Sequence, residues 1–148
     1  MPTTTPIPAK VLNGLIAICE DGAKGFAKAA EDVHAPSLYK LFSHYSSQRA
    51  AYSVELKREM ASLGEETEDA DHLAAAFHRS WMSIKEAVGS KDKVIIFECE
   101  AGENRSVKAY KEALAQPLPP SILQILKSQF AGVIAAHNRL RDLKHSTI

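Results

Sequence analysis

Apolar side chains recur at spacings of three and four along most of this chain, and that period restricts it to helices. No stretch keeps up the period-two alternation of a half-buried strand, and the β-branched residues that favour strands are sparse. The sequence therefore predicts an all-α fold. In residues 9–33, for example, the apolar face consists of Leu12, Leu15, Ile16, Cys19, Phe26, Ala30 and Val33.

Proline and glycine divide the pattern into five helices. Pro36 ends the first, and the second is predicted over residues 38–63 because Gly64 follows it as a C-terminal stop. An acidic connection then leads to a short helix over residues 73–88. The remaining helices are predicted over residues 92–115 and from Ser121 onward, separated by a run of three prolines that no helix interior accepts.

The composition is that of one ordinary globular domain. Of the 148 residues, 45% are hydrophobic and 24% are charged, as in most folded proteins. We expect residues 1–8 to form a flexible Pro/Thr tail and residues 9–148 to form a single bundle domain. Four long helices and one short helix with brief connections predict an antiparallel bundle.

Charge and hydropathy limit which cellular compartments and which binding partners the sequence is compatible with. Eighteen basic and eighteen acidic residues cancel, so no broad positive field exists to hold nucleic acid or an anionic membrane. No apolar run is long enough to span a bilayer, and the N-terminus lacks the apolar core of a secretory signal. Cys19 and Cys99 lie in apolar helical patterns, where free cysteines behave as small hydrophobes. We therefore expect a cytoplasmic protein with no membrane insertion.

An internal repeat relates the two halves of the chain. The repeat predicts two similar helical hairpins, one in each half of the chain. Two such hairpins, with a long connection between the second and third bundle helices, are typical of the ferritin-like arrangement. The extra short helix would then lie in that connection. An offset of 80 aligns Cys19 with Cys99, Glu20 with Glu100 and Gly22 with Gly102, and an offset of 81 aligns Gln48 with Gln129 and Arg58 with Arg139.

Several short motifs also resemble a known family, a set of bacterial ferritin-like four-helix-bundle proteins without an assigned activity. The resemblance extends from about Leu12 to Leu143 and implies the fold but no reaction. Its motifs are Cys19-Glu20-Asp21-Gly22, His78-Arg79-Ser80-Trp81, Glu100-Ala101-Gly102-Glu103, Leu118-Pro119-Pro120 and Ala136-His137-Asn138-Arg139.

Ferritin-like di-iron sites take one Glu from each of two helices and a Glu-x-x-His motif from each of the others. The repeat places Glu20 and Glu100 at the single-carboxylate positions, but Gln48 and Gln129 stand where the motifs would begin, without their histidines. Two carboxylates and two amides carry too little negative charge for two irons. The sequence therefore disfavours an intact di-iron oxidase and predicts that the glutamines form a polar core, bridging Glu20 and Glu100 by hydrogen bonds.

A helical wheel leaves one metal hypothesis open. Glu103 and His137 fall nearer the middle of their apolar faces than Glu20 and Glu100 do. A shifted mononuclear site built from Glu100, Glu103 and His137 would suit iron, manganese or zinc. The simpler interpretation, which we favour, is an interhelical contact between Glu103 and His137 with no cofactor.

The leading functional hypothesis is a non-enzymatic protein with a degenerate di-metal site, which acts by self-association or protein binding. We expect a homo-oligomer and favour a dimer. His78 and Trp81 of the short helix are candidates for the interface. The alternative is a metal-binding protein or a di-iron or manganese oxidase that uses the central Glu and His residues. No phosphate loop or nucleophile elbow indicates another reaction.

Overall fold

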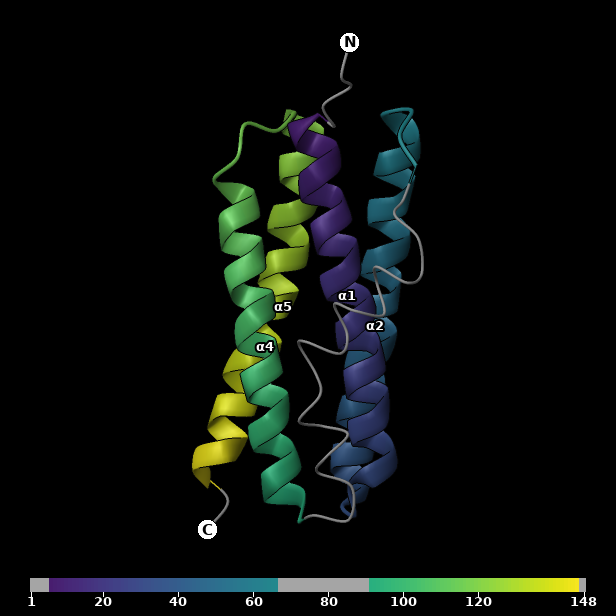
Figure 1. The fold of residues 1–148 in the computed structure, drawn as a ribbon. Coiled ribbons are helices and arrows are strands. Elements are labelled where there is room, and N and C mark those ends of the chain that lie inside the picture. The colour runs from purple at the N-terminus through teal and green to yellow at the C-terminus, as the bar shows by residue number, and fades with distance from the viewer. Residues whose placement is uncertain (1–5, 67–90, 147–148) are drawn as a thin grey trace.

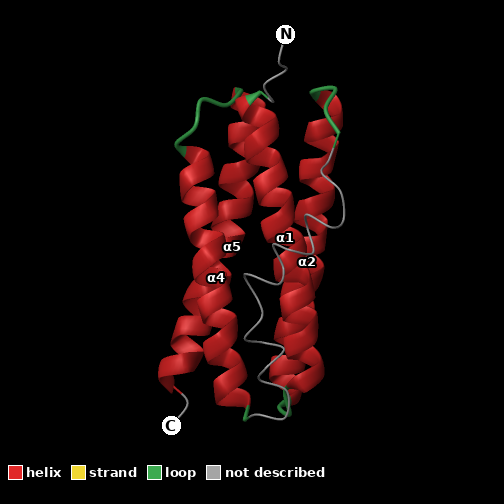
Figure 2. Ribbon diagram, viewed as in Figure 1, coloured by secondary structure: helices red, strands yellow, loops and turns green. Residues whose placement is uncertain are grey.

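The computed structural model describes residues 6–66 and 91–146 of the chain. Within these ranges all regular secondary structure is helical, which confirms the all-α prediction (Figure 2). The predicted short helix over residues 73–88, with His78 and Trp81, lies outside the described residues. The described helices are α1 (Ile7–Asp32), α2 (Pro36–Ser62), α4 (Asp92–Leu114) and α5 (Pro120–Ser146) (Figure 1).

Three of the four helices begin at or next to a proline. Pro8 lies in the first turn of α1, and Pro36 and Pro120 are the first residues of α2 and α5. A proline is well accommodated there because the first N–H groups of a helix have no intrahelical partner. Each of these helices therefore begins one or two residues earlier than the sequence pattern predicts.

Gly64 ends α2, as the sequence predicts. Its φ of 73° is left-handed, a conformation that glycine adopts without a steric penalty. The turn lets the backbone N–H of Glu65 donate to the carbonyl of Met60 at 3.0 Å, which satisfies one of the last free carbonyls of the helix.

The four helices form a bundle of two antiparallel hairpins (Figure 1). One hairpin pairs α1 with α2 and the other pairs α4 with α5, while α1 also packs on α4 and α2 approaches α5. The diagonal pairs, α1 with α5 and α2 with α4, make no close backbone contact. In Figure 1, α2 ends at one end of the bundle and α4 begins at the other.

Asp92 joins the two hairpins at the end of the bundle where α4 begins. Its carboxylate accepts hydrogen bonds from the backbone N–H groups of His34 at 2.7 Å and Ala35 at 2.9 Å, which belong to the turn between α1 and α2. Burial tends to raise the pKa of Asp92, but these hydrogen bonds outweigh it and lower the pKa.

The core consists of two hydrophobic clusters with a polar layer between them. One cluster gathers near the turn between α1 and α2, around Phe26, Phe42 and Ile96. The other lies toward the opposite end, around Leu12, Leu56 and Leu126. None of the described helices is long and apolar enough to cross a membrane.

The predicted inner faces are mostly buried, with two instructive differences. Leu63 is the last residue of the predicted second helix, but it follows the last residue of α2 and is 39% exposed. Arg49 was not expected inside, yet only 1% of its surface is exposed. A charged residue at that depth needs a partner, and its partner defines the candidate site.

Candidate functional site

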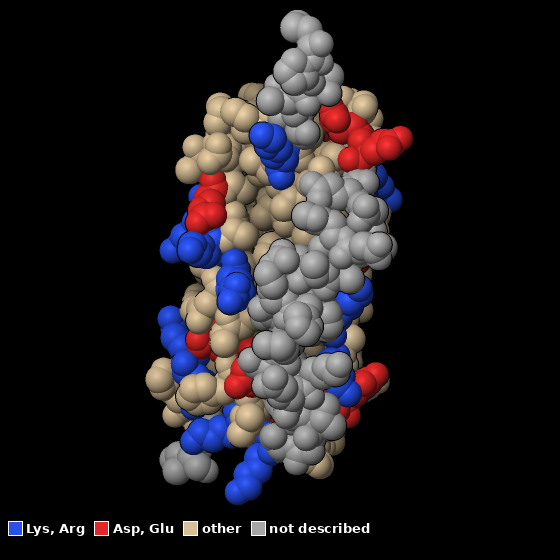
Figure 3. Space-filling view, in the orientation of Figure 1, with Lys and Arg blue, Asp and Glu red and all other residues tan. Residues whose placement is uncertain are grey.

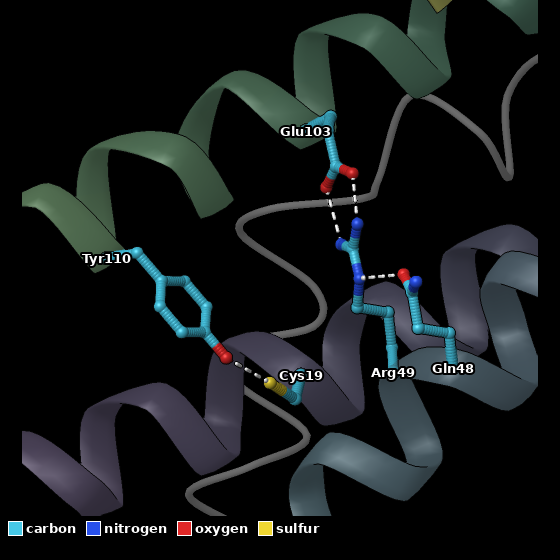
Figure 4. A network of polar contacts seen from close by, with 5 residues as sticks. All are labelled: Cys19, Gln48, Arg49, Glu103 and Tyr110. Atoms are coloured by element: carbon cyan, nitrogen blue, oxygen red, sulfur yellow. Dashed lines mark hydrogen bonds and ion pairs between the residues drawn. The ribbon is translucent and has the colours of Figure 1, made fainter. Parts of the chain in front are cut away.

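A buried ion pair lies in the middle of the bundle. Arg49 on α2 and Glu103 on α4 are 1% and 0% exposed, and both guanidinium nitrogens donate to the carboxylate (Figure 4). Nη1 of Arg49 lies 2.6 Å from Oε1 of Glu103, and Nη2 bonds Oε2. This two-pronged geometry is the strongest form of charge-assisted hydrogen bond between side chains.

The pair crosses the centre of the bundle along a diagonal. Because α2 and α4 are not in close backbone contact, the long arginine side chain has to span the space between them. Gly22 on α1 lies beside it, where an added Cβ atom would make an ordinary van der Waals contact of 3.4 Å with Cγ of Arg49. The guanidinium carbon also lies 5.4 Å from the ring centroid of Phe26, within cation–π range.

The surroundings of Arg49 stabilise its positive charge. Its Nε donates to Oε1 of Gln48 at 3.2 Å, so hydrogen bonds surround the guanidinium on three nitrogens. Burial tends to lower the pKa of Arg49, but the neighbouring Glu103 carboxylate more than offsets this and raises it. A fixed positive charge therefore occupies the middle of the bundle.

A second polar network connects all four helices. Cys19 on α1 and Tyr110 on α4 lie 3.2 Å apart between Sγ and the hydroxyl (Figure 4), and that hydroxyl donates to Oε1 of Gln129 on α5 at 2.6 Å. Nε2 of Gln129 then donates to Oε1 of Glu55 at 2.7 Å and to the backbone carbonyl of Tyr52 at 3.3 Å, both on α2.

The protons in this network have a definite order. Tyr110 gives its only hydroxyl proton to Gln129, so Cys19 has to donate its thiol proton to the tyrosine oxygen. Burial raises the pKa of Cys19 to about 11 and the pKa of Tyr110 well above its ordinary value. Both groups are therefore neutral at physiological pH, and the thiol is not a nucleophilic thiolate.

Glu20 and Glu100 are each held by a lysine of their own hairpin. Glu20 accepts hydrogen bonds from Ser53 at 2.7 Å and Lys57 at 2.9 Å. Glu100 accepts from Lys144 at 2.9 Å and from Asn104 at 3.1 Å. Burial tends to raise the pKa of each carboxyl group, but the hydrogen bonds from these partners lower it.

The contacts divide the residues that the metal hypothesis combines, since Glu103 binds Arg49 whereas Glu100 and His137 both contact Asn104. The expected contact between Glu103 and His137 is not formed, because Glu103 binds Arg49 and Nε2 of His137 contacts Oδ1 of Asn104 at 2.6 Å. Across residues 6–66 and 91–146, no three His, Cys, Asp or Glu side chains are grouped as metal ligands.

The two glutamines lie in the polar core, but not with the predicted partners. Gln129 is 1% exposed and binds Tyr110 and Glu55, while the half-buried Gln48 accepts from Arg49. Their hydrogen bonds do not go to Glu20 and Glu100, which accept instead from Lys57 and Lys144, one within each hairpin. Glutamines are long enough to reach several helices, and spacing alone does not identify the partner.

Comparison with known protein families matches residues 8–116 to a domain of unknown function, DUF2383. The match extends over most of the 148 residues. The chain belongs to this family. The same comparisons find no match among curated proteins.

The DUF2383 match contains both members of the ion pair. Arg49 and Glu103 lie inside it, as do Cys19 and Tyr110, whereas Gln129 lies beyond its end. The signal for Arg49 was present in the sequence. It continues the inner stripe of α2, four residues after Tyr45 and seven before Leu56, where an apolar residue would otherwise be expected.

Proposed function

We propose that this DUF2383 protein is a ferritin-like bundle without di-metal chemistry, which acts by self-association as a homodimer. The observation that carries the proposal is the buried guanidinium of Arg49, bound on two nitrogens by Glu103 in the middle of the bundle. It places a permanent positive charge where a ferritin-like protein would gather acidic ligands around cations.

The ferritin-like part of the proposal is supported by the course of the helices. Two antiparallel hairpins lie side by side through α1 and α4, and α2 ends at the opposite end of the bundle from the start of α4 (Figure 1). A long connection between the second and third bundle helices is the feature that distinguishes this arrangement from a simple up-and-down bundle. The proposal includes the short helix predicted over residues 73–88.

The central side chains do not fit two bound cations. Glu103 is engaged by Arg49, and a divalent ion beside that guanidinium would be repelled at short range in a poorly solvated site. Glu20 and Glu100 are held by Lys57 and Lys144, whose charges already balance theirs. The amides at the remaining positions add no negative charge. We therefore derive no metal-dependent step for this layer.

The layer has a structural role in this proposal. Buried polar groups cost free energy unless they are hydrogen-bonded, and a satisfied network favours one arrangement of the helices over shifted ones. The Cys19 network joins all four helices, and the Arg49 pair joins the diagonal that backbone packing leaves apart. A bundle fixed in this way presents a defined outer surface to a second copy.

Metal analysis and solution mass together test the proposal. Protein purified without chelator, from cells supplied with iron, manganese and zinc, is analysed by mass spectrometry for metals and by analytical ultracentrifugation. We expect far less than one metal ion per chain and the mass of a dimer. Stoichiometric metal that is lost in Glu100→Gln and Glu103→Gln would instead establish the metal-binding alternative.

The two measurements fail independently. A chain that stays monomeric at every accessible concentration contradicts self-association, whatever its metal content. A metal-loaded dimer contradicts only the degenerate site. The variant Lys40→Ala, at an exposed position of α2, serves as a control that should change neither result.

A further inference from the structure

An apolar groove lies between α1 and α4. It has a volume of about 460 Å³ and is formed by the first half of α1 and the last two turns of α4. Figure 3 shows it as a hollow in the upper half of the view, between these two helices. Its lining includes Val11, Gly14 and Ile18 from α1 and Ala109 and Ala113 from α4.

Small residues create the groove. Gly14 has no side chain, and a Cβ atom built there would meet nothing within 4 Å. Ala109 faces the groove from α4 with a single methyl group. Beside this hollow stands a large apolar side chain, Ile7, which is 47% exposed. The same face therefore carries both a hole and a projecting aliphatic group.

The groove also carries one charge of each sign. Lys10 lines it from α1 and Glu112 lines it from α4, and both side chains are exposed. Among the described residues neither forms an ion pair within the chain. A surface that offers a cation on one side and an anion on the other is complementary to a copy of itself.

We infer that the α1/α4 groove is the homodimer interface, with Lys10 of each subunit opposite Glu112 of the partner subunit. The inference rests on the proposed self-association and specifies its surface. The occupant is a second copy of this chain, because the hole, the aliphatic projection and the two opposite charges all occur on one face. A two-fold interface uses the same patch on both subunits and therefore needs such self-complementarity.

The symmetry follows from the directions of the helices. The groove lies between two antiparallel helices, α1 and α4, which run side by side (Figure 1). A two-fold axis in the interface and parallel to the helices places α1 of each subunit against α4 of the other. Lys10 and Glu112 both lie near the end of the bundle where α1 begins and α4 ends, so the axis brings them together twice.

Charge reversal tests the interface directly. Lys10→Glu would face Glu112 with a like charge at two symmetric places, and Glu112→Lys would do the same with lysines. We expect each single variant to weaken the dimer by about tenfold or more, since two surface ion pairs are lost and each is replaced by a repulsion between like charges. Sedimentation velocity across a concentration series measures the dissociation constants.

Mixing the two variants provides the decisive control. A Lys10→Glu subunit carries two acids at these positions and a Glu112→Lys subunit carries two lysines, so only the mixed dimer restores both pairs. We expect the equimolar mixture to regain the wild-type mass and the double variant Lys10→Glu/Glu112→Lys to dimerise as the wild type does. A mixture that stays as monomeric as its components would overturn the inference.

A steric variant tests the groove without altering this charge pair. Gly14→Arg fills the hollow, and the open space at Gly14 indicates that the bundle itself tolerates a side chain there. The matched control is Ala135→Arg, at an exposed position of α5, which is not in contact with α1. We expect only Gly14→Arg to abolish the dimer, while circular dichroism and thermal unfolding stay those of a folded bundle.

The outcomes separate the two proposals. A wild-type dimer that persists in Gly14→Arg and in both charge variants would place the interface elsewhere, which overturns this inference and leaves self-association intact. It would also leave the groove to another occupant, such as a helix of a different protein. A wild-type chain that is monomeric throughout would contradict the proposed function itself.

Discussion

Arg49 is buried in a position where arginine is rarely tolerated. Removing a guanidinium from water costs several kcal/mol, and only a close counter-charge with good hydrogen bonds compensates for it. Glu103 supplies the charge, Gln48 accepts from the remaining nitrogen, and the Phe26 ring lies within cation–π range of the guanidinium. Glu103 and Phe26 lie on α4 and α1, so the burial of Arg49 depends on the packing of three helices.

Breaking the ion pair on one side should be far worse than removing it altogether. Arg49→Met leaves the Glu103 carboxylate buried without its counter-charge, and we expect the free energy of unfolding to fall by about 3–5 kcal/mol. The double variant Arg49→Met/Glu103→Leu fills the same space with apolar groups and should recover most of that loss. Urea unfolding of the wild type, both single variants and the double variant gives the coupling energy.

Arg58→Met is the matched control, because Arg58 is an exposed arginine on the same helix. It should change the free energy of unfolding by no more than about 0.5 kcal/mol. If Arg49→Met resembled this control, the guanidinium would have to be solvated rather than buried against Glu103.

For single residues, the sequence predicted which side chains are buried more accurately than which partners those side chains contact. Gln129 was expected in the polar core and lies there, 1% exposed. The sequence did not assign Arg49 to the core, because a charged residue on a helix is normally solvated. Its partner is 54 positions away in the sequence, and no local period encodes such a distance.

At the scale of the helices, α2 and α5 approach closely at one glycine. A Cβ atom on Gly132 would overlap the hydroxyl of Tyr52 and lie 3.2 Å from Nε2 of Gln48. These two side chains therefore occupy the space that a larger residue at position 132 would need. Elsewhere the two helices are joined by few close backbone approaches.

Gly132→Ala should destabilise the protein, although alanine is the better helix former. Replacing glycine inside a helix normally stabilises it by about 0.5–1 kcal/mol, but forcing Tyr52 aside costs about 1–3 kcal/mol. We expect a lower melting temperature for Gly132→Ala and recovery when Tyr52→Phe removes the overlapping hydroxyl. Thermal unfolding followed by circular dichroism measures both.

Gly14→Ala is the comparison that isolates the effect of space. Its new methyl group meets nothing within 4 Å, so only the gain in helix propensity remains. We expect it to unfold at the same or a higher temperature than the wild type, at protein concentrations low enough to keep the chain monomeric. Equal behaviour of the two alanine variants would show that α2 and α5 are not in close contact at Gly132.

The boundaries of the four described helices were predicted to within one or two residues because they depend on local chemistry. Gly64 adopts the left-handed conformation of a helix stop, and the proline run separates α4 from α5. The errors have a local cause too, since Pro36 and Pro120 open helices that the pattern begins after them. How the helices pair depends on side chains far apart in sequence. For this pairing the internal repeat was the only evidence that the sequence offered.

At the scale of the whole molecule, each hairpin is stabilised by an ion pair between a lysine and a glutamate on its two helices. Lys57 holds Glu20 within the first hairpin, and Lys144 holds Glu100 within the second. The two glutamates are equivalent in the internal repeat, but the two lysines are not. The positions that the proposed ferritin-like alignment assigns to metal ligands thus serve here as links between neighbouring helices.

These links make the stability of the bundle sensitive to acid. The pKa values of Glu20, Glu100 and Asp92 are lowered in the folded protein, so the unfolded chain binds more protons as the pH falls. The stabilisation is complete above the unfolded pKa values of 4.5 for glutamate and 3.8 for aspartate and is lost as the pH falls through the lower folded values. The free energy of unfolding should therefore decrease below about pH 4.5.

Replacing the lysine of either ion pair should weaken the dependence of the free energy of unfolding on pH. The effect should be larger for the more buried pair. The Lys144 and Glu100 side chains are 21% and 9% exposed, whereas those of Lys57 and Glu20 are 43% and 27% exposed and more strongly screened by solvent. Urea unfolding between pH 3 and pH 7 should therefore show a larger loss of acid sensitivity in Lys144→Met than in Lys57→Met. The reverse order would contradict the argument from burial, because water replaces the counter-charge of the buried pair least well. No change in either variant would mean that the acid response comes from other carboxylates.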